Sequence, residues 1–166
     1  MKEQEFLEAY DLYSDALFRH CFFRLYDREK AKDIVQDTFI KTWEYALKNG
    51  NEVSNIRAFL YKVLNNLIVD EIRRKKTLSL EEITETGFQA TDNKMGKITV
   101  ELGAETANLM RCLGKIAEEK KDILIMRYID GFGPKEIAQI LGESENVISV
   151  RLNRALKELR EIFDNG

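Results

Sequence analysis

The sequence is poor in the residues that form disulfides, metal sites and membrane spans. It has two cysteines, one histidine and one proline in 166 residues. No stretch approaches the roughly 20 consecutive apolar residues that a membrane-spanning helix needs. The N-terminal segment MKEQEFLEAY also lacks the apolar centre of a secretory signal. We therefore expect a cytoplasmic protein with no membrane insertion.

The few cysteine and histidine residues do not form the patterns that enzymes and metal sites use. Cys21 and Cys112 stand in apolar helical patterns without a Cys or His at metal-ligand spacing, which predicts buried thiols and no metal site. His20 has no evident catalytic partner, which favours an ordinary helical residue. The chain also lacks a glycine-rich phosphate loop and an HExxH pattern. We expect no enzyme, no catalytic residue and no cofactor.

The residues that are abundant favour an all-α fold. Charged residues make up 33% of the chain and apolar residues 44%, and this mixture is typical of solvated helices. Apolar periodicity predicts two helices within residues 3–48, with a break at Leu25-Tyr26-Asp27. A third helix is expected from near Asn55 to Lys76. These elements predict a three-to-four-helix bundle over residues 1–76.

A linker and a second helical domain follow. Residues 77–103 lose helical periodicity and gather threonine, glycine and acidic residues, which predicts a flexible acidic linker. Residues 104–166 then form a second small domain. Its helices are expected at roughly 104–114, 117–130, 134–141 and 145–163.

The strongest local motif in the second domain predicts a helix-turn-helix. The motif begins at Pro134, and its first helix has an apolar face formed by Ile137 and Ala138. Gly142 permits a tight turn, and Ser144 can cap the next helix. Because the net charge is −3, any DNA contact must be local. A plain helical hairpin with a solvated charged face is the alternative. The side chains of the second helix that face or flank a DNA major groove are predicted to be Asn146, Ser149, Val150, Arg151, Asn153, Arg154 and Lys157.

The predicted third helix carries a second candidate DNA surface. Lys62, Asn66 and Val69 form a mixed polar stripe that leads into the basic cluster Arg73-Arg74-Lys75-Lys76. Cations in a last helical turn also favour the helix dipole. Asn65 and Asn66 lower helix propensity, however, and amides beside a basic patch suit contacts to base edges and phosphates.

The predicted second helix has an acidic face that is separate from its apolar stripe. Asp33, Gln36, Asp37, Ile40 and Glu44 lie on this face, with Ile40 as an apolar residue among acids. Such a face is either simply solvated or a docking surface for a basic helical partner, and the pattern alone favours neither.

Three segments together resemble the extracytoplasmic-function (ECF) sigma factors, in the family of the bacterial housekeeping sigma factor. Residues 31–43, AKDIVQDTFIKTW, are similar to the core-binding helix of region two. Residues 59–76 resemble its promoter-melting and minus-ten segment. ILIMRYIDG at 123–131, followed by KEIA at 135–138 and Leu141-Gly142, looks like region four, the minus-thirty-five reader. The segments follow the family's order and cover nearly the whole chain.

The resemblance implies a sigma factor that binds core RNA polymerase and directs initiation at promoters. Asp33, Gln36, Asp37 and Ile40 would dock on the β′ clamp helices, and region four would meet the β flap. The recognition helix would read the minus-thirty-five element, and an anti-sigma factor is an expected partner. The resemblance and the polar and basic stripe of the third helix together imply a set of residues that contact the minus-ten element. These are Lys62, Asn65, Asn66, Val69, Asp70, Arg73, Arg74, Lys75 and Lys76.

The sequence departs from the family's pattern at two kinds of position. Ile116-Ala117 and Gly133-Pro134 replace its usual Leu-Pro and Ser-aromatic pairs, and both changes read as structural. In the recognition helix, the usual Thr, basic residue and Ser are replaced by Val147, Ser149 and Val150. In the turn before it, usually apolar positions are occupied by Glu143 and Glu145. We therefore expect an unusual upstream element or affinity. A free-standing helix-turn-helix regulator is the rival interpretation, but it leaves the acidic face and the asparagine-rich helix without a role.

Overall fold

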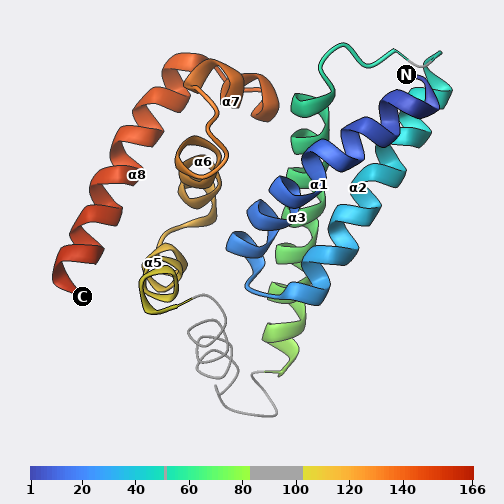
Figure 1. The fold of residues 1–166 in the computed structure, drawn as a ribbon. Helices are drawn as coiled ribbons and strands as arrows, with labels where there is room; N and C mark the ends of the chain where they lie inside the picture. Colours follow the sequence, from blue (N-terminus) through green and yellow to red (C-terminus); the bar gives the residue numbers. More distant parts are fainter. Residues whose placement is uncertain (51, 83–102) are drawn as a thin grey trace.

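The computed structural model describes residues 1–50, 52–82 and 103–166, and within these ranges it contains seven helices and no strand (Figure 1). The all-α prediction is confirmed. The helices are α1 (Glu3–Leu25), α2 (Arg28–Lys48), α3 (Ile56–Glu82), α5 (Ala104–Gly114), α6 (Glu118–Tyr128), α7 (Pro134–Leu141) and α8 (Glu145–Asn165). None of these helices is long and apolar enough to cross a membrane.

The break between α1 and α2 lies where the sequence predicts it. Tyr26 adopts a left-handed conformation with φ 56°, which ends α1. The side chain of Asp27 then accepts a hydrogen bond of 3.1 Å from the backbone N–H of Lys30 and caps α2. This tight reversal lays α1 and α2 against each other, with α3 completing the bundle (Figure 1).

The third helix is longer than predicted. It begins at Ile56 and continues through Glu82 instead of ending near Lys76, because no glycine or proline interrupts this part of the chain. The Thr77 hydroxyl donates to the Arg73 carbonyl at 3.1 Å within the extension. The predicted linker, residues 77–103, therefore starts inside a helix, and its remainder from 83 to 102 lies outside the described residues.

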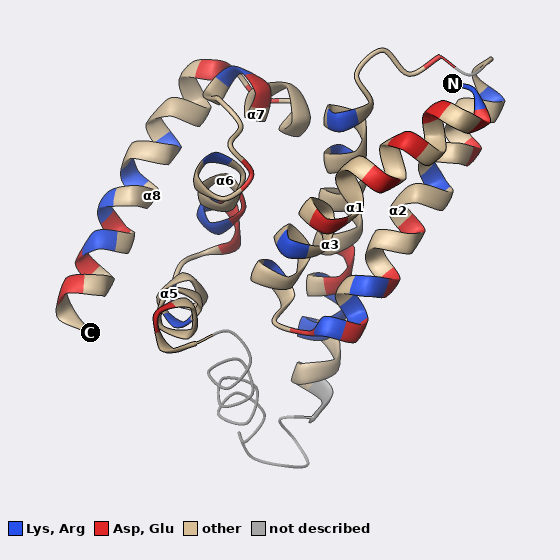
Figure 2. Cartoon of the chain, viewed as in Figure 1, with Lys and Arg blue, Asp and Glu red and all other residues tan. Residues whose placement is uncertain are grey.

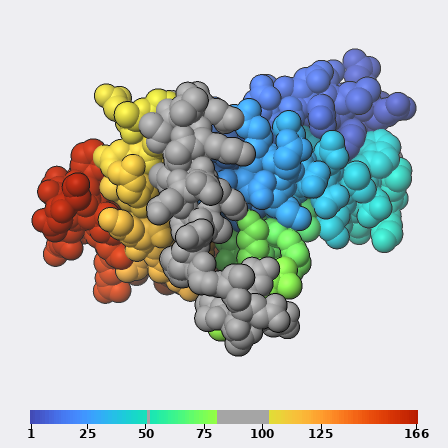
Figure 3. All heavy atoms as spheres, turned by 90° about the horizontal axis from the view of Figure 1, so that it is seen from below, coloured from blue at the N-terminus to red at the C-terminus, as the bar shows by residue number. Residues whose placement is uncertain are grey.

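The helices form two groups, α1 to α3 and α5 to α8, that pack directly against each other. Helix α3 contacts α7, and α1 contacts α6. One hydrophobic cluster runs through both groups, and it includes Leu17, Leu64, Ile123 and Ile148. Figure 3 shows the blue-to-green atoms of the first group on one side of the molecule and the yellow-to-red atoms of the second on the other. Helix α8 lies on the outer side of the second group and keeps one face exposed.

Both cysteines are buried and free, as the sequence predicts. Burial raises the pKa of the Cys21 thiol to about 12. Among the described residues, no cluster of three or more His, Cys, Asp or Glu side chains could hold a metal ion.

Candidate DNA and protein interfaces

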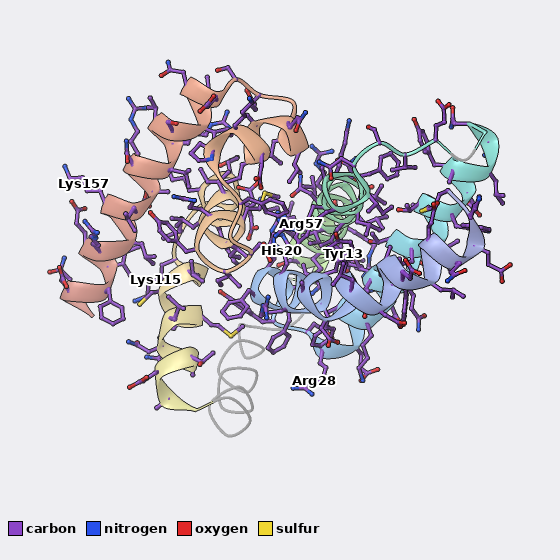
Figure 4. The ribbon with its side chains drawn as sticks, turned by 45° about the horizontal axis from the view of Figure 1, so that its top comes forward. Tyr13, His20, Arg28, Arg57, Lys115 and Lys157 are labelled. Carbon is purple, nitrogen blue, oxygen red and sulfur yellow. The ribbon has the colours of Figure 1, made fainter. Side chains whose placement is uncertain are left out.

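Helix α8 presents the face that the sequence assigns to DNA. Ile148, Leu152 and Ala155 are buried on its inner side. Figure 4 shows Lys157 on the outer side of α8, pointing away from the rest of the chain, and Figure 2 shows basic residues recurring along this helix. The predicted contact residues Asn146, Val150, Asn153, Arg154 and Lys157 are exposed, and Ser149 and Arg151 are half-buried.

The turn before α8 is built as its sequence predicts. Gly142 ends α7 with φ 69°, a left-handed conformation that glycine adopts without strain. The Ser144 hydroxyl accepts a hydrogen bond of 3.2 Å from the backbone N–H of Val147 and caps α8. Gly133 is the N-cap of α7 and Pro134 opens it, so this departure from the family's pattern is compatible with a regular helix start.

An acidic residue in this turn restrains one of the predicted contacts. Arg151 Nη2 lies 3.3 Å from Glu143 Oε1, and each side chain is 39% exposed. About two turns further along α8, Lys120 Nζ lies 2.6 Å from Glu158 Oε2 and links α8 to α6. The first ion pair restrains a residue that the sequence analysis assigns to DNA, whereas the second holds α8 against α6.

The predicted minus-ten residues on α3 divide into exposed and engaged side chains. The amide oxygen of Asn65 accepts a hydrogen bond from Arg24 Nη1, so Asn65 takes part in internal packing. Arg74 donates two hydrogen bonds to Glu71, at 3.1 and 2.7 Å, while remaining half exposed. Val69 and Lys75 are half-buried. Exposed side chains on this surface are Lys62, Asn66, Asp70, Arg73, Arg74 and Lys76.

The acidic face of α2 borders an apolar hollow. Asp33, Gln36 and Asp37 are exposed, and Ile40 leaves 55% of its surface exposed. Tyr10 of α1, at the border of this hollow, is 43% exposed. The hollow has a volume of about 420 Å³ and is lined by Phe6, Tyr10, Gln36, Phe39, Ile40, Trp43 and Glu44.

A second apolar hollow lies in the α5 to α8 group and was not predicted. Tyr128 stands at its edge with 59% of its surface exposed, and the side chains around it come from α5, α6 and α8. Its volume is about 100 Å³. The sequence signal available for it was Tyr128 itself, which closely follows the apolar run from Ile123 to Met126. The lining residues are Leu109, Leu113, Leu124, Ile125, Tyr128, Ile129, Leu156 and Leu159.

A buried polar cluster joins the two helical groups at Asp130. His20 Nδ1 lies 2.6 Å from Asp130 Oδ2, and the Tyr61 hydroxyl donates to Asp130 Oδ1 at 2.9 Å. The side chains of His20 and Asp130 have no exposed surface. Burial lowers the pKa of His20 more than the carboxylate raises it, so we assign a neutral imidazole whose Nδ1–H donates to Asp130. His20 is therefore a structural residue, and its partner is too distant in sequence for the pattern to reveal.

A second buried group of charges lies beside this cluster. Lys121 Nζ donates to the carbonyl of Arg24 at 3.1 Å, and burial lowers the pKa of both side chains. Burial also raises the pKa of Asp122 to about 6, against the opposing charge of Arg24. Glu118 Oε2 lies 3.7 Å from Arg24 Nη2.

Comparison with known proteins identifies the family. Sigma-70 region 2 matches residues 9–77, and sigma-70 region 4 matches residues 106–159. RNA polymerase sigma factor SigV of Bacillus subtilis is 30% identical over 146 residues, which cover 86% of this chain and 81% of SigV. The ECF RNA polymerase sigma factor SigW of the same species is 24% identical over 169 residues, which cover 96% of this chain and 89% of SigW. The chain belongs to the sigma-70 family, among the ECF RNA polymerase sigma factors.

Two solved structures share the fold. One is the sigma factor RpoE in complex with the anti-sigma factor NepR from Bartonella quintana, with a TM-score of 0.75 and 21% identity over 97% of this chain and 98% of that one. The other is CnrH in complex with the cytosolic domain of CnrY, with a TM-score of 0.69 and 21% identity over 99% of this chain and 90% of that one. Both likenesses extend over the two helical groups.

Proposed function

We propose that this sigma factor binds core RNA polymerase through α2, reads a minus-thirty-five element with α8, and captures an opened minus-ten element with α3. The observation that carries this proposal is the exposed face of α8, which presents Asn153, Arg154 and Lys157 beyond a capped helix-turn-helix. Arginine and asparagine side chains can make bidentate contacts to guanine and adenine edges in a major groove.

The acidic face of α2 supports the assignment of the polymerase contact. Asp33 and Asp37 are exposed beside Ile40, and the apolar hollow continues from Ile40 toward α1. An apolar centre within an acidic frame suits a basic amphipathic helix, because desolvated apolar contact provides affinity and opposite charge provides orientation. We assign this surface to the β′ clamp helices and the smaller hollow beside Tyr128 to the β flap.

The surface of α3 suits single-stranded DNA better than duplex DNA. Asn66 and Arg73 are exposed within a mixed stripe that also carries the carboxylate of Asp70. Amide and guanidinium groups can bond to bases that have left the stack, while the basic end of the stripe attracts phosphates. Capturing such bases would offset the few kcal/mol that unstacking and unpairing cost. The chain would thus assist strand opening, and bond formation would belong to the polymerase.

An anti-sigma factor is the proposed inhibitory partner. The structures of RpoE and CnrH that share this fold are both complexes, one with the anti-sigma factor NepR and the other with the cytosolic domain of CnrY. The exposed apolar residues that border the hollow on α1 and α2, such as Tyr10 and Ile40, offer a surface that an inhibitor could cover in competition with polymerase.

Run-off transcription with purified core RNA polymerase tests the proposed function. Adding the chain to core enzyme on a library of promoter fragments should produce discrete transcripts that core enzyme alone does not make. A matched chain with Asp33→Lys and Asp37→Lys should produce none. Duplex DNA binding without any association with core polymerase would instead identify a free-standing helix-turn-helix regulator.

A further inference from the structure

The outward face of α8 has an aliphatic side chain at its centre. At 3.6 residues per turn, successive residues of a helix point in directions about 100° apart. The buried residues Ile148, Leu152 and Ala155 therefore share one side of α8, and Val150 points to the opposite side. Lys157, which Figure 4 shows pointing away from the rest of the chain, lies almost two turns beyond Val150 on the same side. Val150 thus lies on the centre line of the surface that α8 offers to a partner.

The residues around Val150 on this face are of two kinds. Asn146 and Asn153 lie about 40° and 60° from Val150 in one direction around the helix. Arg154 and a second valine, Val147, lie about 40° and 60° away in the other direction. Val150 is 39% exposed and Val147 is 37% exposed. An exposed aliphatic pair is therefore bordered by amide and guanidinium groups that can bond to base edges.

Both valines lie in the part of α8 that a helix-turn-helix directs into a major groove. Ser144 is the N-cap of the helix, and its hydroxyl accepts a hydrogen bond of 3.2 Å from the backbone N–H of Val147. Val147 is therefore in the first turn of α8, and Val150 is one turn further on. The N-terminal residues of a recognition helix are the ones that contact base edges. Their position thus favours contacts of the valines with bases.

The charge of this segment makes such contacts important for binding. Residues 143–157 contain the cations Arg151, Arg154 and Lys157. Glu143 and Glu145 offset two of these three charges, and Glu143 Oε1 lies 3.3 Å from Arg151 Nη2. Attraction to phosphates, which is independent of sequence, grows with the number of cations that neutralise them. Since little net positive charge is left here, affinity of α8 for DNA depends strongly on its contacts with bases.

Thymine is the base whose major-groove edge fits an aliphatic side chain. Its 5-methyl group is apolar, whereas the other groups that base pairs present in this groove are hydrogen-bond donors and acceptors. Contact between a valine and this methyl group removes apolar surface of both partners from water. A valine placed on a polar base edge would instead leave donors or acceptors without partners. The bordering asparagines can bond to adenine N6 and N7, so they also suit A·T pairs.

We propose that Val150 determines the sequence of the upstream element by packing against the 5-methyl group of a thymine, and that Val147 packs against a methyl group of a neighbouring base pair. This inference rests on the proposed function, because it takes α8 as the reader of the minus-thirty-five element. The upstream element of this chain is therefore rich in A·T pairs where the first two turns of α8 meet it.

Selection from a random library identifies the element, and removal of single methyl groups tests the contact. The full chain in complex with core RNA polymerase would bind promoter fragments with a randomised upstream segment, and the bound fragments would be sequenced. Each thymine of the enriched element would then be replaced by deoxyuridine, which lacks the methyl group and keeps the hydrogen-bonding edges. At one thymine or more, affinity in fluorescence anisotropy should fall about fourfold, the value for one methyl group left in water.

Val150→Ala is the matched change in the protein. It shortens the side chain and preserves α8, because alanine has the higher helix propensity. The loss caused by deoxyuridine at the thymine beneath Val150 should nearly vanish in this variant. Val150→Thr keeps the shape and one of the two methyl groups and should give an intermediate loss. Phe163→Ala, which truncates an exposed side chain near the end of α8, is the control and should retain the full loss.

The possible results separate this inference from the proposed function. No loss at any thymine in the parent chain, or an equal loss in Val150→Ala, would overturn the inference. Weaker binding of Val150→Ala to core enzyme, with the deoxyuridine effect unchanged, would also overturn it and assign Val150 to a protein contact. Transcription from the enriched fragments without any effect of deoxyuridine would leave the sigma function intact. Absence of both enriched fragments and transcripts would refute the proposed function, and thymine reading by α8 with it.

Discussion

Neutralising Glu143 should strengthen binding of the isolated chain to upstream duplex DNA. In the free protein, Arg151 Nη2 is 3.3 Å from Glu143 Oε1, on the side of α8 that we assign to DNA. A phosphate that recruits Arg151 has to displace this carboxylate, which also repels the DNA backbone. Glu143→Gln removes the charge and keeps the size and the hydrogen-bonding ability of the side chain.

The size of the effect follows from the exposure of the pair. Each side chain is 39% exposed, so solvent screens the interaction and about 0.2–1 kcal/mol is the appropriate range. Since 1.4 kcal/mol corresponds to a tenfold change in affinity, Glu143→Gln should tighten binding about 1.4-fold to fivefold. Arg151→Ala should weaken binding and lower the slope of log affinity against log salt by about 0.9, the value for one lost phosphate contact.

A double-mutant cycle in fluorescence anisotropy, measured across a salt series, isolates the pair. The gain from Glu143→Gln should shrink when Arg151 is already alanine, because no guanidinium is left to release. Glu161→Gln, an exposed acid near the end of α8, is the control and should have little effect. An equal gain in both backgrounds would refute the role of the ion pair, and an unchanged salt slope in Arg151→Ala would count against α8 as the DNA-binding helix.

Three further predictions concern the polymerase contact, the helix cap and the buried charges. Asp33→Lys combined with Asp37→Lys should abolish binding to core polymerase in gel filtration without loss of circular dichroism; unchanged affinity would remove the α2 assignment. Ser144→Ala should lower the free energy of unfolding in urea by about 1 kcal/mol, because it removes the α8 cap. Burial lowers the pKa of His20 below its ordinary value of 6.5, so the unfolded chain binds a proton at a higher pH than the folded one does. The free energy of unfolding should therefore fall by up to about 1.4 kcal/mol for each pH unit of acidification below 6.5, and His20→Gln should abolish this pH dependence. The pKa of Asp122 is raised to about 6, so protonation of its carboxyl in the folded chain adds stability as the pH falls below that value. The loss of unfolding free energy on acidification should therefore be steeper in Asp122→Asn, where this opposing effect is absent.

Local sequence signals predicted the helices of region four closely. Pro134 and Gly142 bracket α7, and Ser144 caps α8, because each residue acts on backbone within a few positions of itself. The exposed side of α8 followed from the period of its buried residues. The α1–α2 break at Tyr26 was predicted for the same reason.

Features that depend on distant partners were not predictable from the pattern. His20 meets Asp130 across 110 positions, and Asn65 meets Arg24 across 41, so neither pairing leaves a trace in local spacing. Asn65 was assigned to DNA because a mid-helix amide had no local explanation, yet its oxygen bonds to a buried arginine. The direct packing of region four on region two was missed because a linker rich in polar residues gave no sign of the contact.

Mapping the 5′ ends of transcripts tests the central claim most directly. Core RNA polymerase and this chain would transcribe fragmented genomic DNA, and the start sites would be aligned. The account predicts start sites absent with core enzyme alone, preceded by two shared sequence elements at a fixed separation. Start sites identical to those of core enzyme alone would contradict it.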